Sequence, residues 1–277
     1  MRSSSPTSTP ALDGAGLNAF GSIGRFAIEL ITEVGFGGLL FWRSLLSLRK
    51  LGRSMPLVFE QARRIGIESL PLVIITSTFT GAVTAVQAAY QLKDFVPKLY
   101  LGTAIYKSVV IELGPVMTAL VVGGRVSASI AAELGTMRVT EQIDAMDAMG
   151  VDPVRYLAMP RIVAALIMLP VLTVFADILA IGGGFFISNA SLDISTATFI
   201  EGMRIFFAAH DVMGGLMKAF VFGGIIALMG CAAGLRTAGG AVGVGRSATR
   251  AVVASCVLIL ISDYVLAILL FQVIFGA

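Results

Sequence analysis

Long apolar stretches alternate with short polar connections along this chain, and five of the stretches are long enough to cross a bilayer. A membrane-spanning helix needs about 20 consecutive, mostly apolar residues. The runs are continuous, whereas the strands of an outer-membrane barrel alternate in hydrophobicity at every second residue. The pattern therefore predicts an all-α membrane protein. We expect its five spans at residues 69–92, 101–131, 162–192, 212–235 and 251–275.

The segment before the first span, residues 20–52, predicts an amphipathic helix that lies in the membrane interface. Its apolar residues recur at helical spacing, whereas Arg25, Glu29 and Glu33 follow one another at intervals of four on a different face. Trp42 is typical of headgroup depth. A sixth span interrupted by glycines is the alternative, and the three charges would be costly for it in lipid.

The connection between the second and third spans predicts a short acidic helix. At 3.6 residues per turn, residues 133–150 carry apolar side chains on one side and carboxylates on another. Gly150 is expected to end this helix, and Asp152 with Pro153 to cap and begin the next. A solvated surface helix is the alternative to a helix that docks into a cytoplasmic partner. The expected contact residues are Glu133, Met137, Arg138, Glu141, Gln142, Asp144, Met146 and Asp147.

Composition narrows the class of protein further. Hydrophobic residues make up 57% of the 277, and only 13% are charged, against about 25% in soluble domains. A disordered chain, a collagen-like fibre, a disulfide scaffold and an ordinary soluble enzyme are excluded. Residues 1–19, which begin with a run rich in Ser, Thr and Pro, are expected to form a disordered tail, and residues 20–277 a single domain.

Charge predicts the orientation of the spans. The net charge is +3, and the basic residues gather at the ends of the spans, which indicates membrane topology rather than nucleic-acid binding. Residues 43–64, 138–161 and 236–250 contain 12 Lys and Arg, whereas the connections on the opposite side contain 4. We therefore expect the first set and the N-terminus in the cytoplasm, and the C-terminus outside.

Ionisable side chains inside the spans are candidate functional groups. Each costs at least about 2.5 kcal/mol at the bilayer centre, so it normally faces a cavity or a partner. Glu112 and Lys218 lie at similar depth, which is compatible with an ion pair, and Asp263 is placed to join them; the sequence leaves open whether the two residues pair. A buried pair that only fixes helix packing and a polar patch in which Lys218 meets a lipid phosphate both remain open. Asp177 is equally deep, and Arg125 is expected to extend to the cytoplasmic interface.

Prolines and apolar side chains complete the candidate cavity. Pro115 removes a hydrogen bond beside Glu112 and is expected to kink the second span, as Pro170 does in the third. An apolar stripe in the first span is expected to contact acyl chains, although helix packing explains such a stripe equally well. The stripe consists of Phe79, Val83 and Val86, with Gln87 and Tyr90 near the outer end.

Motifs for catalysis or cofactors are absent from the sequence. It contains no GxxxxGK[ST] and no Gly-Lys pair, so the chain cannot bind ATP by a P-loop. Cys231 and Cys256 lack metal-binding spacing, and His210 is the only histidine and is expected in a loop. The glycines of residues 239–245 are expected to form a flexible turn. We expect no enzyme activity, no cofactor and no metal.

Several motifs in the central block resemble those of the MlaE-type permease family, the membrane subunits of ABC transporters associated with MCE-domain proteins. They include Glu112-Leu-Gly-Pro115, Ala132–Met137 and Glu141–Met146. In that family the position before the motif glutamate is often basic, and here it is Ile111. The resemblance implies phospholipid movement between membranes by a homodimer in the bacterial inner membrane. It also implies cytoplasmic ABC ATPase subunits and an MCE-domain lipid-binding protein on the outer face.

Two other functions remain open on the sequence. An ion-coupled secondary transporter would use Glu112, Asp177 or Asp263 as a proton site, and a membrane scaffold would transport nothing. In the ATP-driven hypothesis, closure of the partner ATPases pushes the 133–150 helix and the spans rock around the cavity.

Overall fold

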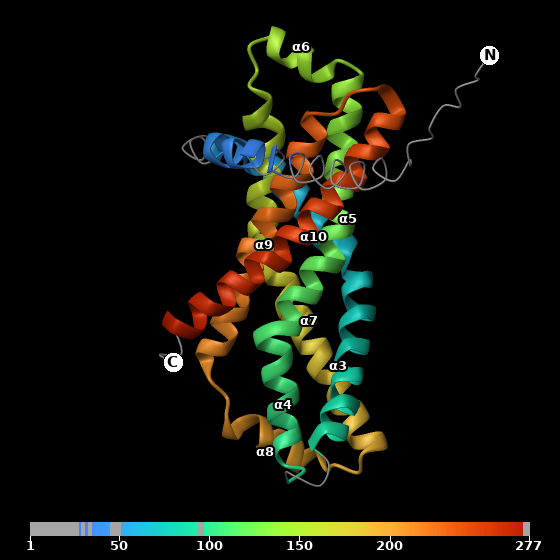
Figure 1. Ribbon diagram of the computed structural model, residues 1–277, viewed down its shortest axis with the longest axis vertical. Coiled ribbons are helices and arrows are strands. Elements are labelled where there is room, and N and C mark those ends of the chain that lie inside the picture. The colour runs from blue at the N-terminus through green and yellow to red at the C-terminus, as the bar shows by residue number, and fades with distance from the viewer. Residues whose placement is uncertain (1–27, 29–30, 33–34, 45–50, 93–96, 274–277) are drawn as a thin grey trace, which may run out of the picture.

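The computed structural model describes residues 28, 31–32, 35–44, 51–92 and 97–273, and every regular element in this part of the chain is helical. The elements form an elongated bundle (Figure 1). In chain order they are α2 (Leu51–Gly66), η2 (Ile67–Ser69), α3 (Leu70–Leu92), α4 (Tyr100–Ser108), η3 (Val109–Leu113), α5 (Gly114–Val139), α6 (Gln142–Ala148), η4 (Val154–Ala158), α7 (Met159–Ser191), α8 (Thr196–Ile205), α9 (Ala209–Leu235) and α10 (Gly240–Val273).

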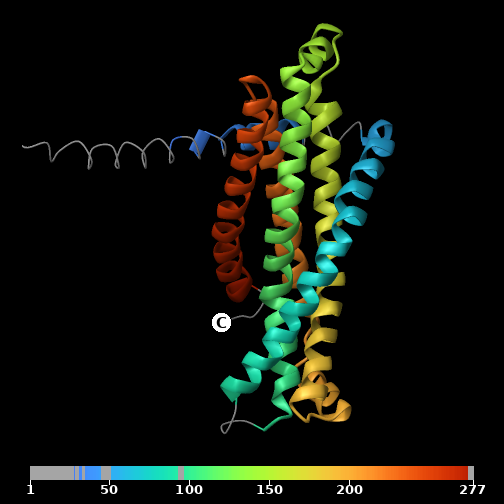
Figure 2. The same cartoon turned by 90° about the vertical axis from the view of Figure 1, so that its right-hand side faces the viewer.

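Five helical stretches among the described residues are long and apolar enough to cross a membrane, which confirms the predicted fold class. Each overlaps one predicted span and begins before it, because the helices start in the more polar sequence ahead of the apolar windows; the third stretch ends one residue and the fifth stretch five residues short of the predicted span. The long helices run along the bundle axis (Figure 2). The stretches are Ser54–Leu92, Tyr100–Val139, Val154–Ser191, Ala209–Leu235 and Gly240–Leu270.

Small residues let α3 and α7 approach closely. A Cβ added at Gly81 would lie 1.7 Å from the carbonyl oxygen of Ala180, and one added at Gly183 would lie 2.3 Å from that of Thr78. Membrane helices lack a hydrophobic drive to associate, so close backbone packing of this kind supplies much of their contact energy. The glycines therefore set the spacing of these two spans.

Gly183→Ala is expected to destabilise the bundle by about 1–3 kcal/mol, the usual cost of overpacking a tight core. The adjacent Gly182 is the matched control, because a Cβ there meets nothing within 4 Å. Thermal unfolding in detergent should show a lower midpoint for Gly183→Ala and little change for Gly182→Ala. Equal midpoints for the two variants would contradict the close packing of α3 on α7.

The two ends of the bundle carry different short helices. Helix α6 lies at one end and α8 at the other (Figure 1). Ser195 caps α8 by accepting a hydrogen bond from the Thr198 N–H at 3.2 Å, and Phe199 is buried against α4. Helix α8 thus packs on α4 at the end of the bundle opposite α6.

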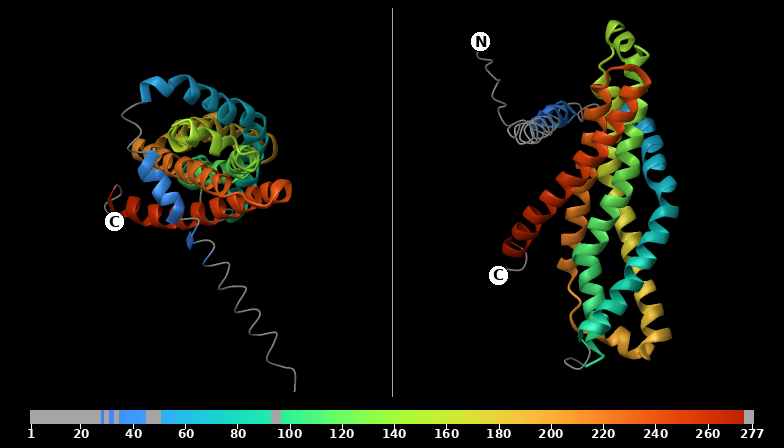
Figure 3. Two further views of the ribbon diagram at one scale, coloured as in Figure 1. Left: turned by 90° about the horizontal axis from the view of Figure 1, so that it is seen from above. Right: turned by 45° about the vertical axis from the view of Figure 1, so that its right-hand side comes forward.

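An N-terminal helix, described at residues 28, 31–32 and 35–44, lies across the long axis of the bundle near the α6 end (Figure 3). Leu40 is 2% exposed and packs into the main core, whereas Trp42 is 62% exposed. Its position at the membrane interface stays a prediction. The predicted tail and the charged residues Arg25, Glu29 and Glu33 lie outside the described residues.

Three local predictions differ from the structure. Pro115 is preceded by a π-helical turn, η3, in which the Gly114 N–H donates to the Val109 carbonyl; such turns are one way a helix accommodates a missing donor. Residues 133–139 continue the second span, so the short helix covers only 142–148. The stretch 239–245 is mostly helical, since positive φ angles occur only at Gly239 and Gly240.

Candidate functional site

Three charged side chains from different helices meet inside the bundle. The Lys218 Nζ atom of α9 lies 2.6 Å from Glu112 Oε2 of η3 and 2.8 Å from Asp263 Oδ1 of α10. We call these residues the charged triad. The structure pairs Glu112 with Lys218, which the sequence left open, and Asp263 completes the site. The lysine thereby ties three membrane-spanning segments together.

Backbone geometry explains how α9 delivers its lysine to this position. A Cβ added at Gly215 would lie 2.3 Å from the Val110 carbonyl oxygen, so α9 touches the backbone of η3 there. Lys218 follows three residues later, on the same face of the helix. A π-helical turn shifts the side chains that follow it around the helix axis, and it contains Glu112 itself.

Exposure within the charged triad is uneven. The Lys218 side chain is 2% exposed and that of Asp263 is 15% exposed, whereas that of Glu112 is 44% exposed. A ligand approaching from outside therefore meets the glutamate before the ammonium group. For Lys218 to contact a lipid phosphate, Glu112 must first move away.

An open cavity of about 730 Å³ lies between α3 and the second span. We call it the α3 cavity. The Thr76, Thr80 and Thr84 hydroxyls that line it each donate to the carbonyl four residues earlier. The other polar side chains of its lining are Gln87, Gln91 and Ser108. Its lining residues are Thr76, Phe79, Thr80, Val83, Thr84, Gln87, Ala88, Gln91, Leu92, Ala104, Ser108, Leu113, Met117 and Val121.

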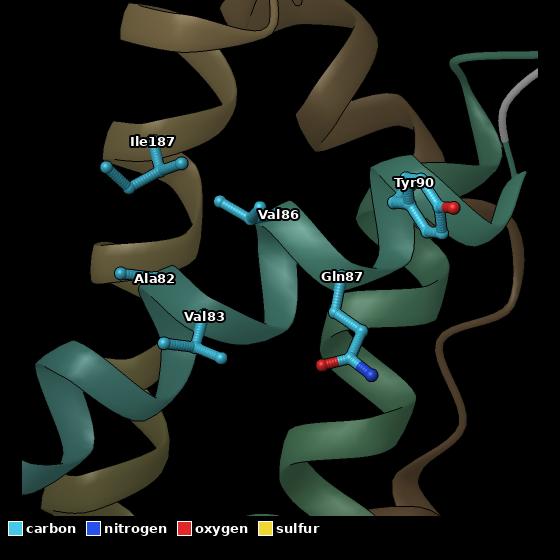
Figure 4. Close-up of a pocket in the computed structure, with 6 residues that line it drawn as sticks. All are labelled: Ala82, Val83, Val86, Gln87, Tyr90 and Ile187. Carbon is cyan, nitrogen blue, oxygen red and sulfur yellow. The ribbon is translucent and has the colours of Figure 1, made fainter.

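A second hollow, of about 470 Å³, lies on the neighbouring face of α3. Figure 4 shows Val86 pointing toward Ile187 of α7, while Gln87 points to the other side of α3. Between them the two hollows are lined by every side chain predicted in the first-span stripe. Those residues are Phe79, Val83, Val86, Gln87 and Tyr90.

The stripe and the charged triad are separate features in this conformation. The α3 cavity is lined from α3, α4, η3 and α5, whereas the triad joins η3, α9 and α10; no residue of the triad lines the cavity. Ser108 and Leu113, which line the cavity, lie four residues before and one residue after Glu112 in the chain. A substrate role for either feature stays a prediction.

Helix α6 is amphipathic, as predicted. Ile143 is 4% exposed and Met146 packs against the core, whereas Glu141 and Asp147 are exposed. Arg138 forms an ion pair with Asp144, so that carboxylate is already engaged within the chain.

The predicted ends of the loop are also confirmed. Gly150 has a φ of 73°, two residues after the end of α6. The Asp152 Oδ1 atom accepts a hydrogen bond from the Val154 N–H at 3.0 Å, and the next helix begins at Pro153. Among the other predicted contact residues, Glu133 is already engaged in ion pairs within the chain.

Glu133 anchors the base of the loop to two other segments. Its carboxylate lies 2.9 Å from Arg161 Nη2 and 3.4 Å from Arg64 Nη1. Arg161 is 4% exposed and also donates to the Leu157 carbonyl at 2.7 Å. Sequence reasoning missed these contacts, because partners distant in sequence have no local signature.

Glu133→Ala is expected to lower the stability of the protein by about 2 kcal/mol, because it leaves the buried Arg161 guanidinium without its carboxylate. Glu60→Ala is the matched control, since Glu60 pairs with Arg64 at 2.8 Å on the surface, where such pairs contribute at most about 1 kcal/mol. Thermal unfolding distinguishes the variants. A Glu133→Ala midpoint no lower than that of Glu60→Ala would show that Arg161 finds another partner.

Two predictions about single residues are corrected. Arg125 does not extend freely to the interface; it lies 2.8 Å from Glu68 and donates to Ser69 at 3.1 Å, tying the second span to the first. His210 lies in the first turn of α9 rather than in a loop, 3.6 Å from Asp211.

Comparison with known proteins gives consistent matches over most of the chain. The family model described as "Permease MlaE" matches residues 58–269. The "Probable ABC transporter permease protein" of Rickettsia felis is 40% identical over 257 residues, which cover 93% of this chain and 99% of that protein. "Protein TRIGALACTOSYLDIACYLGLYCEROL 1, chloroplastic" of Arabidopsis thaliana is 37% identical over 213 residues, covering 77% of this chain and 61% of that protein. The "Intermembrane phospholipid transport system permease protein MlaE" of Haemophilus influenzae is 28% identical over 256 residues, covering 92% and 98%.

Proposed function

Because the chain belongs to the MlaE permease family, we propose that it moves phospholipid or a related lipid between membranes, driven by ATP hydrolysis in a separate cytoplasmic subunit. The chain is a multi-pass membrane protein and a transporter membrane subunit of the ABC type, not an enzyme. The observation that carries the proposal is the family match over residues 58–269, which include the α3 cavity, the charged triad and α6. The lipid class follows from the name of the Haemophilus relative.

Energy enters the transporter through α6 in this proposal. The chain has no P-loop motif, so work must arrive through a contact with an ATPase. Helix α6 projects from the end of the bundle (Figure 2) and exposes Glu141 and Asp147. Its other side rests on the core through Ile143 and Met146, so a push on α6 is transmitted to the second and third spans.

Charge supports an orientation for the assembly. The connections at the α6 end are rich in Lys and Arg, so this end faces the cytoplasm of a bacterium and the protein lies in the inner membrane. The opposite end, with α8, then faces an MCE-domain lipid-binding protein. Two copies of the permease form the transport pathway, each contributing one α3 cavity and one charged triad.

The charged triad acts as a gate for the lipid headgroup in this mechanism. In the present conformation Glu112 covers Lys218. When the spans rock, the phosphate replaces the glutamate as the partner of the buried ammonium group, and the acyl chains occupy the α3 cavity. Release follows when Glu112 returns to Lys218.

Mass spectrometry of the gently extracted complex tests this function. We expect the permease together with an ATP-binding subunit and bound phospholipid. A permease that carries no ATP-binding subunit, and that moves lipid in response to a pH gradient without nucleotide, would overturn the proposal in favour of an ion-coupled carrier.

A further inference from the structure

Arg125 of α5 binds three acceptors at the start of the first span. Its guanidinium lies 2.8 Å from Glu68 Oε2, and it donates to the Ser69 hydroxyl at 3.1 Å and to the Arg64 carbonyl at 3.4 Å. We call this set of contacts the Arg125 clamp. All three acceptors belong to the short segment in which α2 ends and α3 begins, so the clamp fastens the second span to that junction.

The sequence explains why acceptors gather at this junction. Pro71 has no N–H, so the Ile67 carbonyl cannot receive the usual helical bond from that residue. The Leu70 N–H donates to this carbonyl instead and closes the 3₁₀ turn η2. The end of a helix leaves carbonyls for donors from elsewhere, and Arg125 takes that of Arg64 in the last turn of α2.

The clamp lies next to the α3 cavity, on the side of α6. Val121 lines the cavity and precedes Arg125 by about one helical turn. Thr76 is the first lining residue of α3 and follows Ser69 by about two turns. From there the lining continues along α3 toward the α8 end as far as Leu92. The clamp therefore stands between the cavity and the α6 end of the bundle.

Beside the cavity itself, the two spans are not fastened together. The threonine hydroxyls of α3 donate to carbonyls of their own helix. Among the described residues, no hydrogen bond or ion pair joins α3 to α4, η3 or α5. The other ion pair that joins the second span to α2 lies further toward α6, between Glu133 and Arg64. The walls of the cavity are thus held together only at the α6 end by polar contacts of the described residues.

Exposure indicates that the clamp can open. The side chains of Arg125 and Glu68 are 32% and 48% exposed, so water solvates both charges when they separate. Ion pairs in such surroundings contribute little to stability. Lys218 of the charged triad is 2% exposed and has no comparable access to water. A contact that closes a passage and must reopen in every cycle requires the environment of Arg125 rather than that of Lys218.

We propose that the Arg125 clamp closes the α3 cavity toward the cytoplasmic leaflet, and that Arg125 is a positioning residue for transport. While Arg125 holds Glu68, lipid of that leaflet cannot enter. When an ATPase pushes α6 and moves the second span, the ion pair parts and η2 flexes, as short 3₁₀ stretches do at functional hinges. The inference rests on the proposed function for the orientation of the chain and for the role of the cavity.

Labelling of an introduced cysteine tests the clamp in the full-length permease. Thr76→Cys places a thiol in the cavity next to the clamp, in a chain whose Cys231 and Cys256 are replaced by alanine. Inside-out vesicles present the cytoplasmic face to a charged maleimide that does not cross the membrane. We expect slow labelling of this chain. After Arg125→Gln we expect labelling about fivefold faster or more, because the guanidinium loses an ion pair and two hydrogen bonds at once.

Three control variants accompany this measurement. Arg63 is an exposed arginine of α2 without a hydrogen bond or ion pair to the described residues, so Arg63→Gln should leave labelling slow. Met149→Cys, at a side chain 71% exposed beside α6, should label fast in every variant and so verifies which face is presented. Exchanging the pair, Arg125→Glu with Glu68→Arg, should slow labelling again toward the native rate, which a general loss of packing would not produce.

Each result has a distinct meaning. Labelling as slow in Arg125→Gln as in the native chain, or equally fast in Arg63→Gln, would overturn the proposal. An exchanged pair that labels as fast as Arg125→Gln would overturn it too, and an unlabelled Met149→Cys would overturn the orientation and the clamp with it. Labelling needs neither an ATPase nor transport. A clamp that behaves as expected, in a permease whose complete complex transfers no lipid with ATP, would therefore refute the proposed function alone.

Discussion

Replacing Lys218 with methionine is expected to reduce lipid transport by about a hundredfold or more, the largest effect of any single substitution in the chain. Methionine keeps the apolar stem but removes the one cation among the described residues that lies within 3 Å of Glu112 and Asp263. Truncating one partner of a buried charge group commonly costs 3–5 kcal/mol. The phosphate would also lose its binding group. Lipid transfer between liposomes, with the complete transporter reconstituted, measures the effect.

A neutral version of the charged triad distinguishes transport from packing. The triple variant Lys218→Met, Glu112→Gln, Asp263→Asn leaves no buried carboxylate without a cation. Its stability should therefore recover toward that of the native protein. Transport should not recover, because the phosphate still has no cation to bind. A neutral variant that transports lipid at the native rate would show that the charged triad serves helix packing alone.

Reversing charge on α6 is expected to have the second largest effect. The double variant Glu141→Lys, Asp147→Lys should weaken association with the ATPase subunit by about a hundredfold, because unlike charges at the contact become like charges. Asp144 is left unchanged, since its reversal would also break the ion pair with Arg138 inside the chain. Co-purification of the ATPase and ATP-dependent lipid transfer are the two readouts.

The opposite end of the molecule supplies a control for this variant. Asp193 and Glu201 are exposed near α8, at the far end of the bundle from α6. Asp193→Lys, Glu201→Lys changes the net charge by the same amount as the α6 variant, but the ATPase should remain bound. Equal loss of the ATPase from both variants would indicate a non-specific charge effect and would contradict a role for α6.

The spans and helix caps were predictable because their signals are local. Hydropathy over about 20 residues identifies a span without knowledge of its neighbours. Likewise Gly150 and Asp152 act within two or three residues of the helix end that each one caps, as the structure confirms. An ion pair between Glu112 and Lys218 could be suggested from the sequence but not decided, because Asp177 and Asp263 are further carboxylates at membrane depth.

Contacts that depend on helix rotation were not predictable from the chain. The pairs of Glu133 with Arg161 and of Arg125 with Glu68 join different helices, and nothing in the local sequence sets the rotation of one helix against another. Pro115 indicated a distortion but not that it would be a π-helical turn. The glycines after Gly240 suggested a turn, yet packing in α10 overrides their weak helix propensity.

The central claim, that this permease moves lipid with energy supplied by another subunit, is tested most directly by lipid transfer in proteoliposomes. The purified chain is reconstituted alone, with its ATPase subunit, and with that subunit plus ATP, and the passage of a labelled phospholipid to acceptor membranes is measured. We expect transfer only in the third case. Transfer at full rate by the chain alone, without nucleotide, would contradict the account.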